Sequence, residues 1–405
     1  MSGNVPAIRF AGFTEPWEQR KLGELISIAS GMAPSLFNQG DQPYIKVDDL
    51  NHSQRVLTST QSTVARSSCM AKVPAGSTIF AKRGAAIMTN KTRVTGASAY
   101  MDTNMMALIP EGINGEFLYE LIGTIGLSRI ADTSTIPQIN NKHIEPFIVT
   151  IPHSREEQQI VATFFTSLDN LITLHQRKHD QLATLKKSLL EKMFPKPGSD
   201  VPELRFAGFT EPWEQRKLGE FGIKTGPFGS TLHAEDYVAH GTPIVTTEHF
   251  KNGDLPSTGD GIPQVSDEDL ARLGQYQLLR HDIVFSRVGS VDLNAEVKDA
   301  QVGWLFSGRV LRVRPDGSID STFMHYGLST DQVRNSIIER AVGLTMASIN
   351  TGILGDTAFV APIDKAELVM VGSFFSHLDN LITLLQLMHD QLATLKKSLL
   401  EKMFV

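Results

Sequence analysis

Three charged residues in the second half of the chain have types and an order that could support hydrolysis at a metal ion. Asp282, Glu296 and Lys298 follow the D…E-x-K order found in many metal-dependent nucleases. In such sites the carboxylates hold the ion, which activates water and stabilises charge on the phosphate. The spacing here is loose, and the first half of the chain has no equivalent of Glu296 and Lys298. One interpretation of these three residues is a Mg²⁺-dependent DNA nuclease, although common charged residues at loose spacing also arise by chance.

Other catalytic patterns are missing from the sequence. It contains no P-loop, no G-x-G-x-x-G after a strand, no paired H-x-x-x-H and no Cys/His spacing for a metal. The N/D-P-P-Y/F signature of adenine-N6 methyltransferases is also absent. The single cysteine, Cys69, cannot form an internal disulfide, and we expect it to be a small buried hydrophobic residue. We therefore expect no catalytic residue, metal or cofactor in this chain.

Short segments rich in Arg, Lys, Ser, Thr, Asn and Gly favour a DNA-binding function instead. Phosphates accept hydrogen bonds from cations and hydroxyls, and base edges pair with Arg, Lys and Asn side chains. These segments are also typical of ordinary polar loops, which is the other interpretation. The candidate DNA-contacting residues are Lys82, Arg83, Thr89, Asn90, Lys91, Arg93, Gln138, Asn140, Asn141, Lys142, Phe228, Ser230, Thr231, Ser286, Arg287, Ser290, Asn294, Thr345, Ser348 and Asn350.

The composition limits how such a protein could bind DNA. With 405 residues, 41% of them hydrophobic and 20% charged, the chain is long enough for two or three domains with buried cores. The formal net charge of −6 argues against binding through a broadly basic face, so DNA contacts must be local. No run of 18 or more apolar residues and no signal-peptide pattern occur, and we expect a cytoplasmic protein without a membrane partner.

Two segments of the chain occur twice. Arg9–Glu24 (RFAGFTEPWEQRKLGE) recurs without change as Arg205–Glu220, 196 residues later. Leu168–Phe194 recurs as Leu378–Phe404, 210 residues later, with three differences. Between these repeats the similarity is faint but collinear, and the offset rises steadily. A duplicated domain with longer loops in its second copy would produce this pattern, although recombination that homogenised only the ends is the alternative.

The globular parts between the repeats mix strand and helix patterns. Ser77–Ala81 and Asp282–Phe285 are short β-branched runs, whereas Gly115–Arg129 and Ser321–Ala341 have helical periodicity. The predicted fold class is therefore α+β, with two globular α/β domains that share one fold. Nearly identical repeats would suit a common framework or the docking of two copies of one partner. Diverged globular parts would suit the reading of two different targets.

A heptad pattern of apolar residues runs through both copies of the second repeat. Each predicted helix has about 40 residues and is roughly 60 Å long, which is longer than a compact domain of this size needs. We expect the two helices to pair as an antiparallel coiled coil, rather than with another chain. The predicted seam residues are Phe164, Leu168, Leu171, Leu182, Leu185 and Leu189 in the first copy and Phe374, Leu378, Leu381, Leu385, Met388, Leu392, Leu395 and Leu399 in the second.

These features give the predicted domain boundaries. Ser154 opens a predicted capping box, and Asp364 is the predicted N-cap of the second helix. A proline-rich link ends the first helix. The predicted order is a first globular domain at 1–153, a helix at 154–194, a link at 195–203, a second globular domain at 204–365 and a second helix at 366–405.

The whole chain resembles the specificity subunits of Type I restriction–modification systems. The resemblance rests on the repeated EPWEQRKLGE, the I/V-F-A/S-K/R-x-G-A/S segments that begin at Ile79 and Val284, the two T-x-x-x-I-N runs, and Ile151 with Pro152 before the EEQ of 156–158. It covers nearly all of the chain, in the order recognition domain, helix, recognition domain, helix. In the second helix Ala366-Glu-Leu replaces Glu-Glu-Gln, which puts identical docking of two partners in doubt.

The resemblance implies a function and a set of partners. Each target-recognition domain would read half of a bipartite site in double-stranded DNA, and the helices would hold the domains apart and dock two modification (methyltransferase) subunits. Restriction subunits would act as motor and nuclease. S-adenosylmethionine, ATP and Mg²⁺ would belong to those partner subunits, and adenine-N6 methylation would be the outcome. The chain itself would be non-enzymatic.

Overall fold

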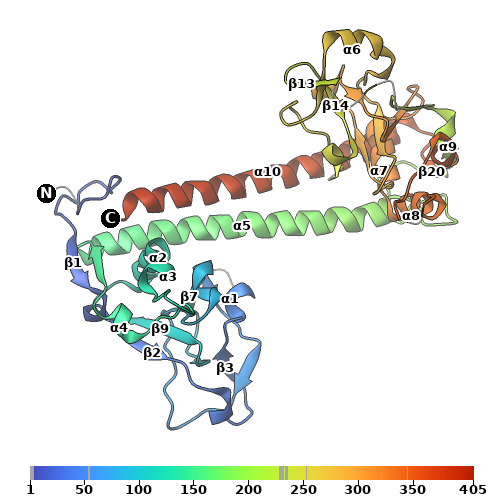
Figure 1. Ribbon diagram of the computed structural model, residues 1–405. Helices are drawn as coiled ribbons and strands as arrows, with labels where there is room; N and C mark the ends of the chain where they lie inside the picture. The colour runs from blue at the N-terminus through green and yellow to red at the C-terminus, as the bar shows by residue number, and fades with distance from the viewer. Residues whose placement is uncertain (1–3, 53–54, 228–231, 233–235, 252, 344) are drawn as a thin grey trace. The chain divides into compact units, whose positions relative to one another are not determined.

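The protein is described by a computed structural model that covers residues 4–52, 55–227, 232, 236–251, 253–343 and 345–405. These residues form two compact units (Figure 1). The first unit comprises residues 1–178 and 385–405, and the second comprises residues 179–384. Each unit is described by itself.

The first unit is built on a five-stranded and a three-stranded sheet. Strand β6 (Thr78–Ala81) is buried on both faces because its side chains alternate between two cores. Phe80 packs in one core with the helices α2 (Gly115–Ile125) and α5 (Arg155–Met193), whereas Ile79 and Ala81 pack in the other. The larger sheet has the order β2-β9-β6-β7-β4, with β2 at Ile26–Ser30, β9 at Met105–Pro110, β7 at Thr92–Thr95 and β4 at Val56–Leu57. The smaller has the order β5-β3-β8, at Ser62–Val64, Gln42–Ile45 and Tyr100–Met101.

Short helices complete the first unit (Figure 1). Asn114 caps α2 (Gly115–Ile125), because its side-chain oxygen accepts from the amide of Phe117 at 3.0 Å. The predicted helix does not run on through residue 129, since Gly126 has a φ of +84° and separates α2 from α3 (Leu127–Ile130). The other short helices are α1 at Asp49–His52 and α4 at Asn141–Ile144.

The second unit repeats this arrangement. Its first sheet has the order β12-β19-β16-β17, at Gly222–Thr225, Val310–Arg314, Ile283–Ser286 and Asn294–Glu296. Its second sheet has the order β13-β15-β14-β18, at Tyr237–Val238, Gln264–Val265, Thr242–Val245 and Leu305–Phe306. The parallel β14–β18 pair corresponds to the parallel β3–β8 pair of the first unit. The helices are α6 at Asp267–Arg272, α7 at Ser321–Leu328, α8 at Asp331–Arg340 and α9 at Thr351–Gly355.

The identical N-terminal repeats fasten each globular domain to its long helix. Strand β1 (Glu18–Lys21) pairs with β10 (Ile148–Ile151), and β11 (Glu214–Lys217) pairs with β20 (Ala358–Ala361) in the same antiparallel register. In the first unit the Arg9 guanidinium binds both carboxylate oxygens of Glu157, at 2.6 and 2.8 Å. In the second unit Arg205 binds Glu367 at the same two distances.

Two helices of 39 residues each, α5 (Arg155–Met193) and α10 (Lys365–Met403), contribute residues to both units. Ser154 Oγ accepts from the amide of Glu156 at 3.2 Å, and Asp364 Oδ1 accepts from that of Ala366 at 2.8 Å, so both predicted caps are present. By length and composition α10 alone among the described helices could cross a membrane. Its two ends instead lie in the cores of the two units.

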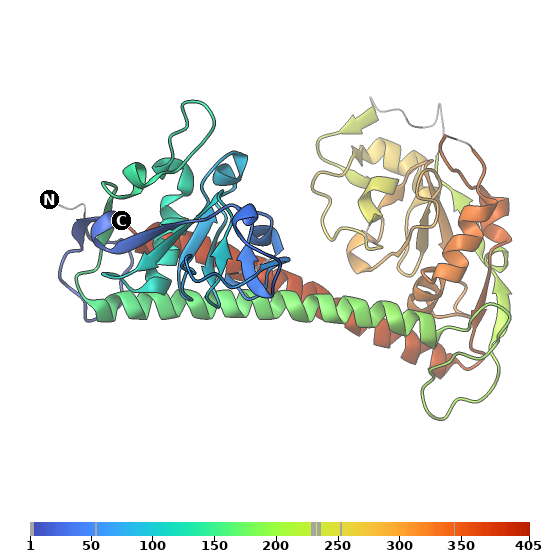
Figure 2. The same ribbon diagram turned by 90° about the horizontal axis from the view of Figure 1, so that it is seen from below.

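Within each unit the segments of α5 and α10 run antiparallel. In the first unit Asp169 binds Lys396 and the carbonyl of Ile172 contacts His389 Nδ1 at 3.3 Å, so the contacts move up one helix and down the other (Figure 2). In the second unit Lys186 binds Asp379 at 2.6 Å. The ion pairs Asp169–Lys396 and Lys186–Asp379 therefore lie where α5 and α10 pack against each other.

The predicted apolar seam is therefore wrong in part. Leu168 and Leu378 are buried in the cores, and the intermediate positions are half-buried: Phe164, Leu182, Leu189, Phe374, Leu385, Leu392 and Leu399. Five predicted seam residues are exposed: Leu171, Leu185, Leu381, Met388 and Leu395. These residues are exposed because each long helix must cover a globular core as well as pack against the other long helix. This rotates the helix contact toward Ile172, Lys186 and Lys396.

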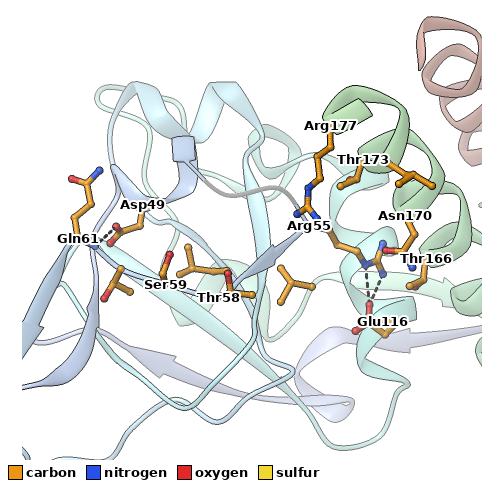
Figure 3. A pocket seen from close by; sticks show the side chains of 14 residues that line it. Asp49, Arg55, Thr58, Ser59, Gln61, Glu116, Thr166, Asn170, Thr173 and Arg177 are labelled. Carbon is orange, nitrogen blue, oxygen red and sulfur yellow. Dashed lines mark hydrogen bonds and ion pairs between the residues drawn. The ribbon is translucent and has the colours of Figure 1, made fainter. Parts of the chain in front are cut away.

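A partly buried cluster of charges joins the first unit's domain to its helices. Arg55 lies between Glu116, Glu120 and Asp169, and Lys396 binds Glu120 and Asp169. Figure 3 shows Arg55 beside Glu116. Burial raises the pKa of the Glu120 carboxyl, although Lys396 and Arg55 act in the opposite direction. Three carboxylates therefore face two cations at this contact.

This raised pKa predicts a pH dependence of stability. Folding raises the affinity of Glu120 for its proton, so the stabilisation is present below the ordinary glutamate pKa and is lost as the pH rises through the folded-state value. We expect Glu120→Gln to flatten the decline in stability above about pH 4.5. Urea unfolding across this range measures it. Glu116→Gln, which removes a half-exposed carboxylate from the same Arg55, is the control, and equal flattening by both variants would contradict the assignment.

Candidate nucleic-acid interface

In the first unit, two loops that the sequence predicted to contact DNA lie side by side. The amide of Gly84 donates to the carbonyl of Pro137 at 2.8 Å, and that of Ile139 donates to the carbonyl of Lys82 at 2.9 Å. An isolated β-bridge pairs Arg83 with Gln138. The turn after β6 and the segment before α4 therefore form one surface. Arg83 is exposed on it, and Gln138 is half-buried.

The second unit has the same pair of loops. The amide of Gly289 donates to the carbonyl of Ala347 at 2.8 Å, and that of Ile349 donates to the carbonyl of Arg287 at 2.9 Å. Val288 and Ser348 form the corresponding β-bridge. The backbone match shows that Lys82, rather than Arg83, occupies the position of Arg287. Burial, and then Arg83 beside it, lower the pKa of the Lys82 amine.

A third segment completes the surface in the first unit, and sequence reasoning missed it. This segment is the turn from Asp102 to Asn104, between β8 and β9. The amide of Lys82 donates to the carbonyl of Asn104 at 2.8 Å. Asp102 Oδ1 accepts from both the amide and the Nδ2 of Asn104, at 2.9 Å each. The Asn104 side chain is exposed.

The matching turn of the second unit runs from Ser307 to Arg309, between β18 and β19. The amide of Arg287 donates to the carbonyl of Arg309 at 2.9 Å, and Ser307 Oγ accepts from the amide of Arg309 at 3.4 Å. Arg309 stands where Asn104 stands in the first unit. The signal was present in the sequence, since the offset of 205 that relates Ile79 to Val284 also relates Asn104 to Arg309.

The residues after β3 and after β14 border the same surface, because the amide of Asp102 donates to the carbonyl of Ile45 at 2.8 Å and that of Ser307 to Val245 at 2.9 Å. The amide of Lys46 donates to Asp49 Oδ2 at 2.7 Å, and that of Thr246 donates to His249 Nδ1 at 3.1 Å. Burial lowers the pKa of the His249 imidazole, which keeps Nδ1 available as an acceptor at neutral pH. These two segments thus share a backbone turn but carry different side chains.

In the second unit these segments enclose a cavity of about 680 Å³. Arg287, Arg309, Ser307, Thr246, Glu248 and His249 are among its lining residues. Arg287 donates through Nη1 to the carbonyl of Gly308 at 2.9 Å, so its guanidinium holds the turn that carries Arg309. Two guanidinium groups, hydroxyls and an imidazole at one cavity provide the donors and acceptors that base edges and phosphates require.

Several predicted DNA-contacting residues have structural roles instead. Asn90 has a φ of +50°, donates to the carbonyl of Gly123 and accepts from the amide of Leu127, so it links two elements of the domain. Arg93 donates to the carbonyls of Thr92 and Leu50, and burial lowers its pKa. Asn140 and Asn350 are helix N-caps of α4 and α9.

The prediction that Ser286 and Asn294 contact DNA is wrong for a different reason. Both are buried in the second unit. Ser286 Oγ donates to the carbonyl of Val288, and Asn294 contacts His325 and Ser329. Ser286 thus holds the turn after β16 and Asn294 joins β17 to the end of α7, and burial keeps both side chains from DNA.

The remaining predicted residues are placed as follows. Lys91 Nζ donates to Asn51 Oδ1 at 2.6 Å. This contact lies outside the surface formed by residues 82–84, 102–104 and 137–139, which with its counterpart at 287–289, 307–309 and 347–349 is called the three-segment surface. Ser348 Oγ donates to the carbonyl of Val342 at 3.2 Å. Phe228, Ser230 and Thr231 lie outside the described residues. Exposed side chains are those of Thr89, Asn141, Lys142, Ser290 and Thr345.

The geometry contradicts the nuclease interpretation. Asp282 is fully buried, and both of its oxygens bind the Arg314 guanidinium at 2.7 Å. Glu296 accepts hydrogen bonds from Ser321 and Thr322, and Lys298 binds Asp254 at 2.7 Å on the surface. Within the described residues no group of three or more His, Cys, Asp or Glu side chains is placed to hold a metal ion.

Two further features of the first unit do not form a second site. A cavity of about 760 Å³ lies between the loop at 57–61 and α5 (Figure 3). Of its charged groups, Arg55 binds Glu116, and Asp49 accepts from the amide of Gln61. Cys69 is exposed rather than buried as the sequence suggested, because it lies in the polar loop at 66–72, between β5 and β6.

Comparison with known proteins agrees with this architecture. Residues 14–184 match the family described as the Type I restriction modification DNA specificity domain. The match spans the first globular domain and most of α5. It is 23% identical over 315 residues to the Type I restriction enzyme MjaIX specificity subunit of Methanocaldococcus jannaschii, which covers 71% of this chain and 68% of that relative.

Other similar proteins match this chain over nearly its full length. The MjaVIII specificity subunit of the same organism is 20% identical over 405 residues, 95% of this chain and 91% of the relative. The crystal structure of the Type I S subunit from M. genitalium has a TM-score of 0.60 at 14% identity and covers 99% of both chains. A structure from work on assembly of the type I R-M system has a TM-score of 0.54 at 16% identity and covers 96% of this chain and 97% of that one. These structures share the fold.

Proposed function

We propose that this chain is the DNA specificity subunit of a Type I restriction–modification complex. Each globular domain reads one half of a bipartite site in double-stranded DNA, and partner subunits carry out adenine-N6 methylation and restriction there. The observation that carries this proposal is the three-segment surface. Its backbone hydrogen bonds are the same in both units, whereas its exposed side chains differ, as at Asn104 and Arg309.

The chain supplies recognition and no chemistry. The carboxylates considered for a nuclease are engaged in ion pairs and hydrogen bonds. S-adenosylmethionine, ATP and Mg²⁺ belong to the modification and restriction subunits. The net charge of −6 fits this division of labour, because phosphate neutralisation would come largely from the partners. The complex would act in the cytoplasm.

The long helices offer a surface for two modification subunits. Three leucines are exposed in the first copy, Leu171, Leu174 and Leu185, and the matching three are exposed in the second: Leu381, Leu384 and Leu395. Exposed apolar residues at repeated positions are typical of a protein interface. Because the residues are identical in the two copies, they fit two copies of one partner. Beside them the helices differ, since Leu387 and Met388 replace Arg177 and Lys178.

An exchange of one recognition domain tests the proposal. Residues 17–150 would be replaced by the corresponding residues of a relative with a different target, and the methylated adenines in cells with the modification subunit would be sequenced. We expect one half-site to change completely and the other to stay the same. Exchange of residues 213–365 should change only the other half. An unaltered site after both exchanges would show that the globular domains do not select DNA.

A further inference from the structure

The side chain at the tip of the β8–β9 turn in the first unit differs in chemistry from the side chain at the tip of the matching β18–β19 turn in the second unit. Asn104 in the first unit and Arg309 in the second follow the same backbone turn and are both exposed. The two residues are joined by their carbonyls to the matched positions Lys82 and Arg287. We propose that these two tip residues each read one base, Arg309 a guanine and Asn104 an adenine. This inference rests on the proposed DNA-recognition function.

The chemistry of Arg309 fits a guanine edge. The guanidinium presents parallel N–H donors, which match the N7 and O6 acceptors of guanine in the major groove. Within the described residues the Arg309 side chain makes no hydrogen bond or ion pair, so its donors face solvent at the cavity. Arg287 stiffens the turn by donating to the carbonyl of Gly308, the residue before Arg309. A stiff turn lowers the entropic cost of binding.

The chemistry of Asn104 fits an adenine edge. A side-chain amide can donate to adenine N7 and accept from N6 at the same time. Asp102 Oδ1 accepts one of the two Nδ2 protons of Asn104 at 2.9 Å. This contact fixes the amide orientation and leaves the second Nδ2 proton and the Oδ1 atom to the base. Asp102 is thus a positioning residue, and Ser307 takes its place in the second unit.

Phosphate binding is the other role that an exposed arginine could have. A phosphate contact would lower binding to all sequences alike, whereas a bidentate base contact discriminates at one position. The enclosing residues favour the base. Thr246, His249 and Ser307 line the cavity with Arg309 and offer neutral donors and acceptors, and Glu248 would repel a phosphate.

The test uses the full chain in complex with its modification subunit. Sequencing of methylated adenines, and methylation rates on oligonucleotides with each base substituted, would be compared for wild type and Arg309→Gln. We expect a loss of about 5- to 150-fold on the wild-type site, with relaxed preference at one guanine in the half-site that depends on residues 213–365. Arg272→Gln removes one positive charge from α6 of the same unit, outside the cavity, and should leave the rates unchanged.

The reciprocal variant tests the first unit. Asn104→Arg is expected to change one adenine of the other half-site to guanine. An even loss on all sequences, an unchanged motif, or a change in the wrong half-site would overturn the inference. These outcomes are distinct from failure of the proposed function, because the domain exchanges show separately whether each half-site follows its globular domain. Both variants change exposed side chains, and an unaltered melting temperature would confirm that they fold.

Discussion

Replacing Phe404 with alanine is expected to destabilise the first unit by about 3–5 kcal/mol, the usual cost of removing a buried phenylalanine. Phe404 is near the end of the chain, yet its ring lies in the core that residues 17–168 build. Its centroid is 5.2 Å from that of Phe117, 6.0 Å from Phe165 and 6.1 Å from Trp17. The C-terminal segment is therefore part of the N-terminal domain's core.

Hydrogen exchange read by mass spectrometry suits this measurement, because two units need not unfold in one step. Protection should fall in peptides from β6, β9 and α2, while the second unit stays protected. Deletion of Val405 alone, which is 48% exposed, is the control and should change little. Equal loss of protection in both units would show that Phe404 does not act within the first core. Phe194→Ala is the matched variant, since Phe194 contacts Trp213, Phe323 and Phe375 in the second unit.

The regular elements were predictable because local patterns dominate them. The strands β6 and β16 and the caps Ser154 and Asp364 lie where the sequence patterns place them. The helix at 321–341 is divided between Leu328 and Asp331, because Ser329 and Thr330 bond back to the carbonyls of the preceding turn. Side chains that cap their own helix in this way are hard to distinguish from helical residues by periodicity alone.

The DNA-contacting surface was predictable only in part. The loops at Lys82 and Gln138 were identified by their polar residues, and the structure brings them together. Asn90 and Arg93 have the same composition, but tertiary contacts that no local pattern reports use up their hydrogen bonds. Asn104 was missed because a single polar residue in a tight turn carries no compositional signal. In the sequence only the offset of 205 relates it to Arg309, and the backbone hydrogen bonds of the two turns match in the same way.

The apolar seam predicted for the long helices shows a related limit of prediction from sequence. A heptad pattern indicates which residues share a helix face, but it does not say what that face meets. Leu171 and Leu381 share a face with the buried residues Leu168 and Leu378, yet both are exposed. A repeat that serves a core, a neighbouring helix and a partner carries apolar residues for all three purposes.

Replacing Arg9 with methionine should cost about 3–5 kcal/mol, because it leaves a buried carboxylate without its partner. Glu157 is 1% exposed and binds Arg9 through both oxygens, and Trp17 Nε1 donates to it at 3.1 Å. Urea unfolding at pH 7.5 measures this loss.

The second unit provides the matched test of the same ion pair. Glu367 is fully buried and binds Arg205, but Trp213 Nε1 makes no hydrogen bond within the described residues, so Glu367 has one donor fewer than Glu157. Arg205→Met should therefore destabilise its unit at least as much as Arg9→Met destabilises the first. Adding Glu157→Gln to Arg9→Met should restore much of the loss, because an amide carries no charge to desolvate. If the double variant were no more stable than Arg9→Met at pH 7.5, lost packing of the arginine side chain rather than an unpaired charge would explain the effect.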